Sequence, residues 1–176
     1  GRDIEGGNET LPLAERFLAP YPETKAEAER LVLAANSRDL RTTALRPHLI
    51  WGPGDPHILP RLAARARGGR LRLPGADKLV DTVFVENAAR AHVNALLNLE
   101  AEGTCAGRAY FISNDEPLPQ AEIIGRLLDA IGVDARIQPV PAWAARTAAA
   151  AVETAWRLLQ LRSEPPLTRF YVDQLC

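Results

Sequence analysis

The feature that most constrains the fold is a strong helical segment followed closely by a short strand. Residues 21–35 are rich in Ala, Glu, Leu and Lys, which favour a helix. Residues 41–45 (Arg-Thr-Thr-Ala-Leu) are β-prone, and the Arg46-Pro47 step predicts the end of that strand, because a residue before proline is disfavoured in the helical region. A helix leading into a strand is the repeating step of parallel sheets, so the sequence predicts an α/β fold.

The rest of the chain continues this alternation. Gly132 is the expected C-terminal cap of one helix, and Asn87 is the predicted N-cap of another. Residues 1–20, which are polar and contain Gly6 and Gly7, are expected to form a loop. Further strands are predicted at 71–74, 80–85, 108–112 and 136–140, and further helices at 59–66, 86–99, 119–131 and 142–161.

Charge and hydropathy argue against a nucleic-acid-binding surface and against a transmembrane helix. The net charge is −1 and the basic residues are scattered, so nothing indicates a nucleic-acid surface. The longest apolar stretch, residues 140–161, contains Arg146, Glu153 and Arg157, which makes it too polar for a transmembrane helix. We therefore expect no nucleic-acid partner and no transmembrane segment.

Cysteine and histidine are equally sparse. The chain has 2 cysteines, Cys105 and Cys176, which are far apart and form no C-x-x-C motif. Its 3 histidines, His48, His57 and His92, show no metal-ligand spacing. This pattern argues against a metal site and a disulfide framework, and it fits a reducing cytoplasm.

Tyr21 and Lys25 are the candidate catalytic residues. They lie four residues apart at the start of the first helix, so their side chains share one face, one turn apart. A nearby cation favours the phenolate form of tyrosine. A tyrosine tuned in this way can pass a proton to or from a carbonyl or alcohol oxygen near neutral pH. Such pairs also arise by chance, as a tyrosine that packs and a lysine that is solvated.

Four motifs in a fixed order favour the catalytic interpretation. They are Tyr21-Pro-Glu-Thr-Lys25, the Leu45–Asp55 segment with its Trp51-Gly52-Pro53-Gly54-Asp55 turn, the Val80–His92 segment, and Gly107-Arg-Ala-Tyr-Phe-Ile112. In this order and content the chain resembles the extended short-chain dehydrogenase/reductases, and within them the 3β-hydroxysteroid dehydrogenase branch. The resemblance runs from residue 20 to near the last residue.

The resemblance implies the carboxyl-terminal part of a Rossmann-type doubly wound parallel sheet, together with a small α/β substrate-binding region. Residues 1–52 would be the second half of the dinucleotide-binding domain. Residues 53–176 would be mainly the substrate-binding or cap region, with 80–112 returning to the sheet. The Gly-rich dinucleotide loop of the family and its catalytic Ser or Thr lie upstream of the tyrosine, and neither is found in this sequence. We therefore expect this chain to be the second half of a longer enzyme.

The resemblance also implies roles for individual residues. Tyr21 would give a proton in reduction and accept one in oxidation, and Lys25 would bind the nicotinamide ribose and favour the phenolate. The backbone of Pro47, His48, Leu49 and Ile50 would line the nicotinamide. For Pro47, the alternative is that it simply ends the strand.

Four residues are expected to meet the substrate. Trp51, Gly52 and Pro53 would shape a turn beside cofactor and substrate, with a simple loop as the alternative. Trp143 would belong to an apolar cover over a long alkyl or ring substrate, with ordinary core packing as the alternative.

The implied activity is NAD(P)-dependent reduction of the ketone of a 2-alkyl-3-oxoalkanoic acid to the 3-hydroxy acid, as in bacterial long-chain olefin biosynthesis. NADP or NAD would be the cofactor, with NADPH favoured. The alternatives are a 3β-hydroxysteroid or sterol dehydrogenase, and a non-catalytic scaffold or fragment of the same fold. Expected partners are an apolar small-molecule substrate, a second copy in a homodimer, and other enzymes of olefin biosynthesis.

Overall fold

The computed structural model describes residues 6–17, 19–56, 58–161, 163 and 165–176 and divides into two compact units. Of the described residues, the Tyr21 unit comprises 6–54 and Asp81–Glu116, and the Trp143 unit comprises Asp55–Val80 and Pro117–Cys176. Residues 1–5, 18 and 57, which include part of the expected first loop and His57, lie outside the described residues.

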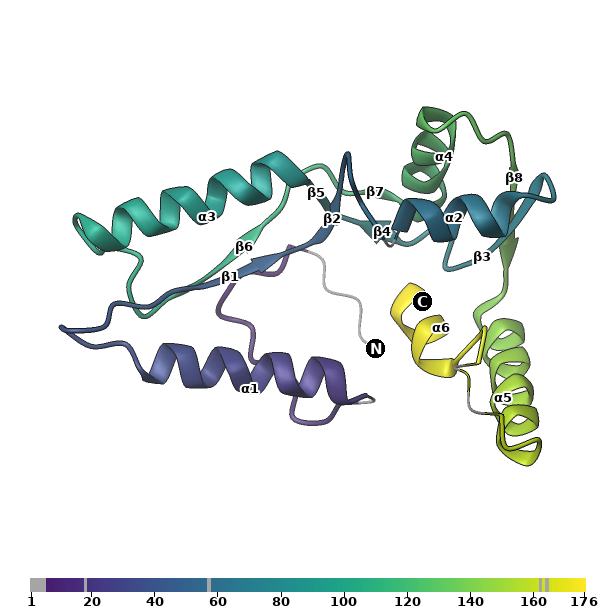
Figure 1. The fold of residues 1–176 in the computed structure, drawn as a ribbon, viewed down its shortest axis with the longest axis horizontal. Coiled ribbons are helices and arrows are strands. Elements are labelled where there is room, and N and C mark those ends of the chain that lie inside the picture. The colour runs from purple at the N-terminus through teal and green to yellow at the C-terminus, as the bar shows by residue number, and fades with distance from the viewer. Residues whose placement is uncertain (1–5, 18, 57, 162, 164) are drawn as a thin grey trace. The chain divides into compact units, whose positions relative to one another are not determined.

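The Tyr21 unit is built from two parallel strand pairs and two long helices. The strand β1 pairs with β6 from Ala44↔Ala109 to Pro47↔Ile112. The strand β2 pairs with β5 from Leu49↔Thr82 to Trp51↔Phe84. Figure 1 shows α1 and α3 on opposite sides of the β1–β6 pair, the layering of an α/β fold. The elements are α1 (Pro20–Ala34), β1 (Ala44–Pro47), β2 (Leu49–Trp51), β5 (Thr82–Phe84), α3 (Val85–Glu100) and β6 (Ala109–Ile112).

The Trp143 unit has its own apolar core. The parallel pair β3–β8 packs with α2 and α4, and a second cluster of Ala145, Ala149 and Val172 joins α5 to α6. Figure 1 labels these elements, which are α2 (Ile58–Ala66), β3 (Arg70–Pro74), β4 (Leu79–Val80), β7 (Leu118–Pro119), α4 (Gln120–Ala130), β8 (Arg136–Val140), α5 (Ala142–Leu158) and α6 (Arg169–Leu175). The buried members of the first cluster are Ala66, Leu71, Leu73, Ala76, Ile124 and Leu128.

Most predicted helices agree with the structure to within a residue or two, including the first at Pro20–Ala34. Gly132 has φ +69° directly after α4, so its predicted capping position is confirmed. The helix predicted at 142–161 ends at Leu158. Neither the short strand β2 nor the helix α6 was predicted from the sequence.

Three local predictions were wrong in detail. The first strand begins at Ala44 rather than at residue 41. The hydroxyls of Thr42 and Thr43 donate hydrogen bonds to the carbonyls of Val32 and Arg108, and these bonds hold the residues before the strand in place. Asn87 does not cap α3, which begins at Val85. Its amide instead donates to Asn114.

The strand predicted at 80–85 is also interrupted at Asp81. One carboxylate oxygen of Asp81 accepts hydrogen bonds from the N–H groups of Thr82 and Glu116. The residues before it pair antiparallel with β7, whereas those after it pair parallel with β2. This break is where the chain leaves one unit and enters the other.

Candidate active site

The direction of α1 is set by its contacts with β1. The hydroxyl of Thr42 donates to the carbonyl of Val32 at 2.7 Å, and Arg46 bonds to Glu29 further along the strand. Residue numbers therefore fall along the helix as they rise along the strand, and Figure 1 shows this antiparallel course. At 1.5 Å per residue, Lys25 lies roughly 6 Å and Tyr21 roughly 12 Å beyond Glu29, toward the carboxyl end of the strand.

Tyr21 and Lys25 both have accessible side chains. Tyr21 lies in the first turn of α1 and is 65% exposed, while Lys25 is also exposed. Between them, the hydroxyl of Thr24 donates to the carbonyl of Tyr21 at 2.9 Å, which supports the first helical turn. Ala26, on another face of the helix, is buried at 6% exposure. The packing of α1 thus leaves the phenol and the ammonium group free to meet a ligand.

The segment Pro47–Ile50 runs toward the same end of the unit. It joins β1 to β2, and the N–H of His48 donates to the carbonyl of Ile112 at 2.9 Å. The imidazole of His48 lies edge-on to the ring of Phe111, with ring centroids 5.7 Å apart. Leu49 and Ile50 are 44% and 38% exposed. Their backbone and that of His48 lie beyond the carboxyl end of β1, where ligands gather in open α/β sheets.

Trp51 and Gly52 are packed against β5 and the start of α3. The indole N–H of Trp51 donates to the hydroxyl of Thr82 at 3.1 Å, and its ring lies 5.1 Å from that of Phe84. Gly52 is buried, and a Cβ placed on it would lie 2.5 Å from Val85 Cγ1. Pro53, which follows, is exposed. Packing alone thus explains the small residue at position 52.

Trp143 belongs to the other unit. It lies in the first turn of α5 and is 72% exposed, and its carbonyl accepts a hydrogen bond from the hydroxyl of Thr147. Tyr21, Lys25 and residues 47–53 therefore belong to one unit, and Trp143 belongs to the other.

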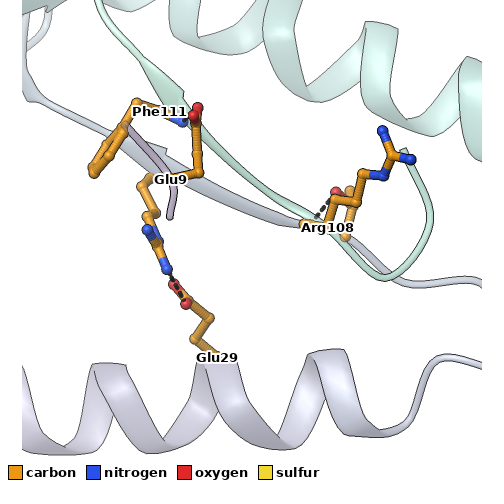
Figure 2. Close-up of polar contacts among 6 residues, drawn as sticks. Glu9, Glu29, Arg108 and Phe111 are labelled. Atoms are coloured by element: carbon orange, nitrogen blue, oxygen red, sulfur yellow. Dashed lines mark hydrogen bonds and ion pairs between the residues drawn. The ribbon is translucent and has the colours of Figure 1, made fainter. Parts of the chain in front are cut away.

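An ion pair that was not predicted from the sequence lies beside the candidate catalytic residues on α1. Arg46 donates two hydrogen bonds to Glu29, from Nη2 at 2.6 Å and from Nε at 2.9 Å (Figure 2). The hydrogen bond from Arg46 is the main reason why the pKa of Glu29 lies below its ordinary value. The same bond raises the pKa of Arg46. The available signal was the spacing, because Glu29 follows Lys25 by four residues, as Lys25 follows Tyr21.

These residues are the ones that could hold one face of a nicotinamide cofactor. An exposed tyrosine, an exposed lysine and the exposed residues 48–50 lie toward one end of the sheet, and the buried Gly52 keeps the next turn close to α3. Among the described residues, no group of three His, Cys, Asp or Glu side chains could hold a metal ion. In the same residues, no helix combines the length and apolar character needed to cross a membrane.

Known proteins of two kinds are similar to most of this chain. The chain is 52% identical over 175 residues to the 2-alkyl-3-oxoalkanoate reductase of Stenotrophomonas maltophilia, which covers 98% of this chain and 53% of that protein. It is 40% identical over 147 residues to the human sterol-4-alpha-carboxylate 3-dehydrogenase, decarboxylating, covering 81% of this chain and 39% of that protein. The chain spans about half the length of the curated relatives it matches.

A solved structure supports the fold. The dTDP-glucose 4,6-dehydratase of Streptomyces venezuelae, solved with NAD bound, superposes with a TM-score of 0.59 at 26% identity, over 78% of this chain and 43% of that one. This confirms the predicted Rossmann-type α/β fold. The sequence profile of the 3-beta hydroxysteroid dehydrogenase/isomerase family matches residues 1–141. The chain therefore belongs to the 3-beta hydroxysteroid dehydrogenase/isomerase family.

Proposed function

We propose that the full-length protein carrying this chain is an NAD(P)-dependent oxidoreductase that reduces the ketone of a 2-alkyl-3-oxoalkanoic acid to the 3-hydroxy acid. The observation that carries this proposal is the 52% identity, over 98% of the chain, to a 2-alkyl-3-oxoalkanoate reductase. The exposed Tyr21 and Lys25 support it, since they supply the proton-transfer chemistry that such a reduction needs.

In the proposed reaction, a nicotinamide cofactor held by these residues would supply the hydride for the ketone carbon. The hydroxyl of Tyr21 donates a proton to the ketone oxygen, so that hydride and proton together convert the ketone to an alcohol. The ammonium group of Lys25 binds the ribose hydroxyls and stabilises the phenolate left on Tyr21. The backbone of Pro47, His48, Leu49 and Ile50 orients the nicotinamide. NADPH is the favoured cofactor and NADH the alternative.

On the substrate side, we assign Trp51, Gly52 and Pro53 to the wall beside the reacting carbon and Trp143 to an apolar cover for the alkyl chains. The exposure of Trp143, 72%, supports a role other than core packing. Each methylene group of the substrate that is buried would contribute roughly 0.8 kcal/mol to binding. An apolar cover would therefore select long substrates.

The second candidate is a 3β-hydroxysteroid or sterol dehydrogenase. The 40% identity to a sterol-4-alpha-carboxylate 3-dehydrogenase favours it. The two relatives' names imply a shared chemical pattern, in which the reacting oxygen is on the carbon β to a carboxylate. Both candidates therefore need the same Tyr21 and Lys25 chemistry, and they differ in the shape of the apolar part of the substrate. A non-catalytic scaffold is a weaker alternative, because it has no need for the tyrosine–lysine pair.

The first test is the intact mass of the purified full-length protein, followed by oxidation of NADPH or NADH with a 2-alkyl-3-oxo acid and with a 3-oxosteroid. We expect turnover with the acid. Tyr21→Phe should abolish turnover and spare cofactor affinity, whereas the matched control Tyr110→Phe, in β6, should keep the wild-type rate. Near-normal turnover of Tyr21→Phe would contradict the catalytic assignment, and preference for the steroid would favour the second candidate.

We also propose a homodimer formed through the α1 helix, association with other enzymes of olefin biosynthesis, and a cytoplasmic location. The cytoplasmic location is supported by Cys105 and Cys176, which are both free thiols. Mass measurement in solution, co-purification and cell fractionation would test these three points separately.

A further inference from the structure

The Glu29–Arg46 ion pair differs from its neighbour on the same helix. It joins α1 to β1, and the side chains of Arg46 and Glu29 are only 18% and 14% exposed. The pair Arg30–Glu27 lies within α1, and its side chains are 52% and 56% exposed. An exposed pair within a helix contributes little to stability. A shielded pair between two elements fixes how these elements sit against each other.

Arg46 is held from a second side as well. Its register partner across the sheet is Phe111, and its guanidinium lies 5.3 Å from the centroid of that ring. The same ring makes a T-shaped contact with the imidazole of His48. The N–H of Phe111 donates to a carboxylate oxygen of Glu9 at 2.8 Å, as Figure 2 shows. The contacts of Arg46 thus run from the middle of α1 to the segment that follows β1.

The geometry of this contact suits a positioning role. Two parallel N–H···O bonds between a guanidinium and a carboxylate fix both distance and orientation, which a single bond does not. Glu29 lies one helical turn from Lys25 and about two turns from Tyr21 on the same side of α1. Arg46 directly precedes Pro47, where the proposed nicotinamide wall begins.

We propose that Glu29 and Arg46 are positioning residues. By fixing α1 on β1, they hold Tyr21 and Lys25 in a fixed position relative to the Pro47–Ile50 segment. This inference rests on the proposed function, because the segment and the tyrosine are assigned to the same cofactor. Neither Glu29 nor Arg46 needs to touch cofactor or substrate. A displacement of about 1 Å between catalytic groups is enough to slow a reaction roughly 100-fold.

The test compares Glu29→Ala with Glu27→Ala in the full-length protein. Both changes remove a carboxylate from α1 and insert the best helix former, but only the first releases Arg46. Single-turnover oxidation of bound NADPH by the 2-alkyl-3-oxo acid gives two separate readouts. The amplitude reports the fraction of folded, loaded enzyme, and the rate constant reports the chemistry in that fraction.

We expect Glu29→Ala to lower the rate constant roughly 10- to 100-fold while most of the amplitude remains, and Glu27→Ala to match wild type. Arg46→Lys keeps the positive charge and the ion pair but loses the two-pronged geometry, so it should also lower the rate constant and is the second variant if Glu29→Ala folds poorly.

A wild-type rate constant with reduced amplitude in these variants would overturn the inference, because the pair would then serve stability alone. Failure of both variants to fold would overturn it in the same way. If Glu29→Ala keeps both rate and amplitude while wild type is active, the positioning role is wrong and the proposed function stands. If wild type itself does not oxidise NADPH or NADH, the proposed function fails and the inference fails with it.

Discussion

The replacement of Gly52 by alanine tests the packing at the start of α3. Gly52 has φ +153° and Gly54 has φ +81°, conformations that residues with a Cβ rarely adopt. Backbone strain at either position should cost on the order of 1–3 kcal/mol. At Gly52, a Cβ would also lie 2.5 Å from Val85 Cγ1 and 3.1 Å from the ring of Phe84. At Gly54, nothing lies within 4 Å of it.

Gly54→Ala is therefore a matched control that carries the strain without the clash. The extra methyl in a filled space should add roughly 1–3 kcal/mol, so Gly52→Ala should lower the free energy of unfolding by that much more than Gly54→Ala. The assay is urea unfolding of the full-length protein, followed by tryptophan fluorescence. Shortening Val85 to alanine removes the nearest atom, so Val85→Ala should recover part of the loss only in the Gly52→Ala background.

Equal destabilisation by Gly52→Ala and Gly54→Ala, within about 0.5 kcal/mol, would refute this account of the packing. The absence of any coupling between Gly52→Ala and Val85→Ala would refute it independently. In either case the backbone conformation of Gly52, with φ +153°, would remain as the reason for a glycine at position 52.

Three further predictions follow from the structure. Leu128 is 1% exposed, so Leu128→Ala should lower the free energy of unfolding by about 2–5 kcal/mol in a denaturant titration; a loss below 1 kcal/mol would contradict its place in the core. Trp143 is 72% exposed, so Trp143→Ser should change stability by no more than about 0.5 kcal/mol; it should raise the KM for long-chain acids, and an unchanged KM would count against the apolar cover. The lowered pKa of Glu29 means that its pairing with Arg46 contributes fully above the ordinary carboxyl range and is lost as pH falls through the lowered pKa. The stability of wild type relative to Glu29→Ala should therefore shrink on acidification, and a difference that stays constant down to pH 2 would contradict the pairing.

Short-range patterns in the sequence were sufficient for most of the helices. The first helix was predicted within one residue of Pro20–Ala34, because its composition and the prolines near its start act locally. The cap at Gly132 followed for the same reason. The helix α6 was missed, because Thr168 caps only seven residues, and their helical state depends on the packing of Val172 against Ala145 and Ala149.

The candidate site was likewise predictable from the sequence only where its residues are close together in the chain. The Tyr21–Lys25 pair was visible because helical spacing places residues four apart on one face. Its surroundings were not visible, because Arg46 follows Glu29 by 17 residues and Phe111 is far along the chain. No local pattern predicts that Arg46 contacts Glu29 or that Phe111 contacts His48, since strand pairing is decided by which sheet edge a segment reaches.

The α/β class, most of the helices and the candidate Tyr21–Lys25 pair thus follow from the sequence, because periodicity and capping act within a few residues. The interruption at Asp81, the parallel register of β1 on β6, the packing that requires Gly52 and the ion pair that joins α1 to β1 belong to the tertiary structure. Each of these features arises when segments distant in the chain come into contact. Burial and hydrogen bonding in the assembled unit, rather than local conformational preference, then decide which contacts form.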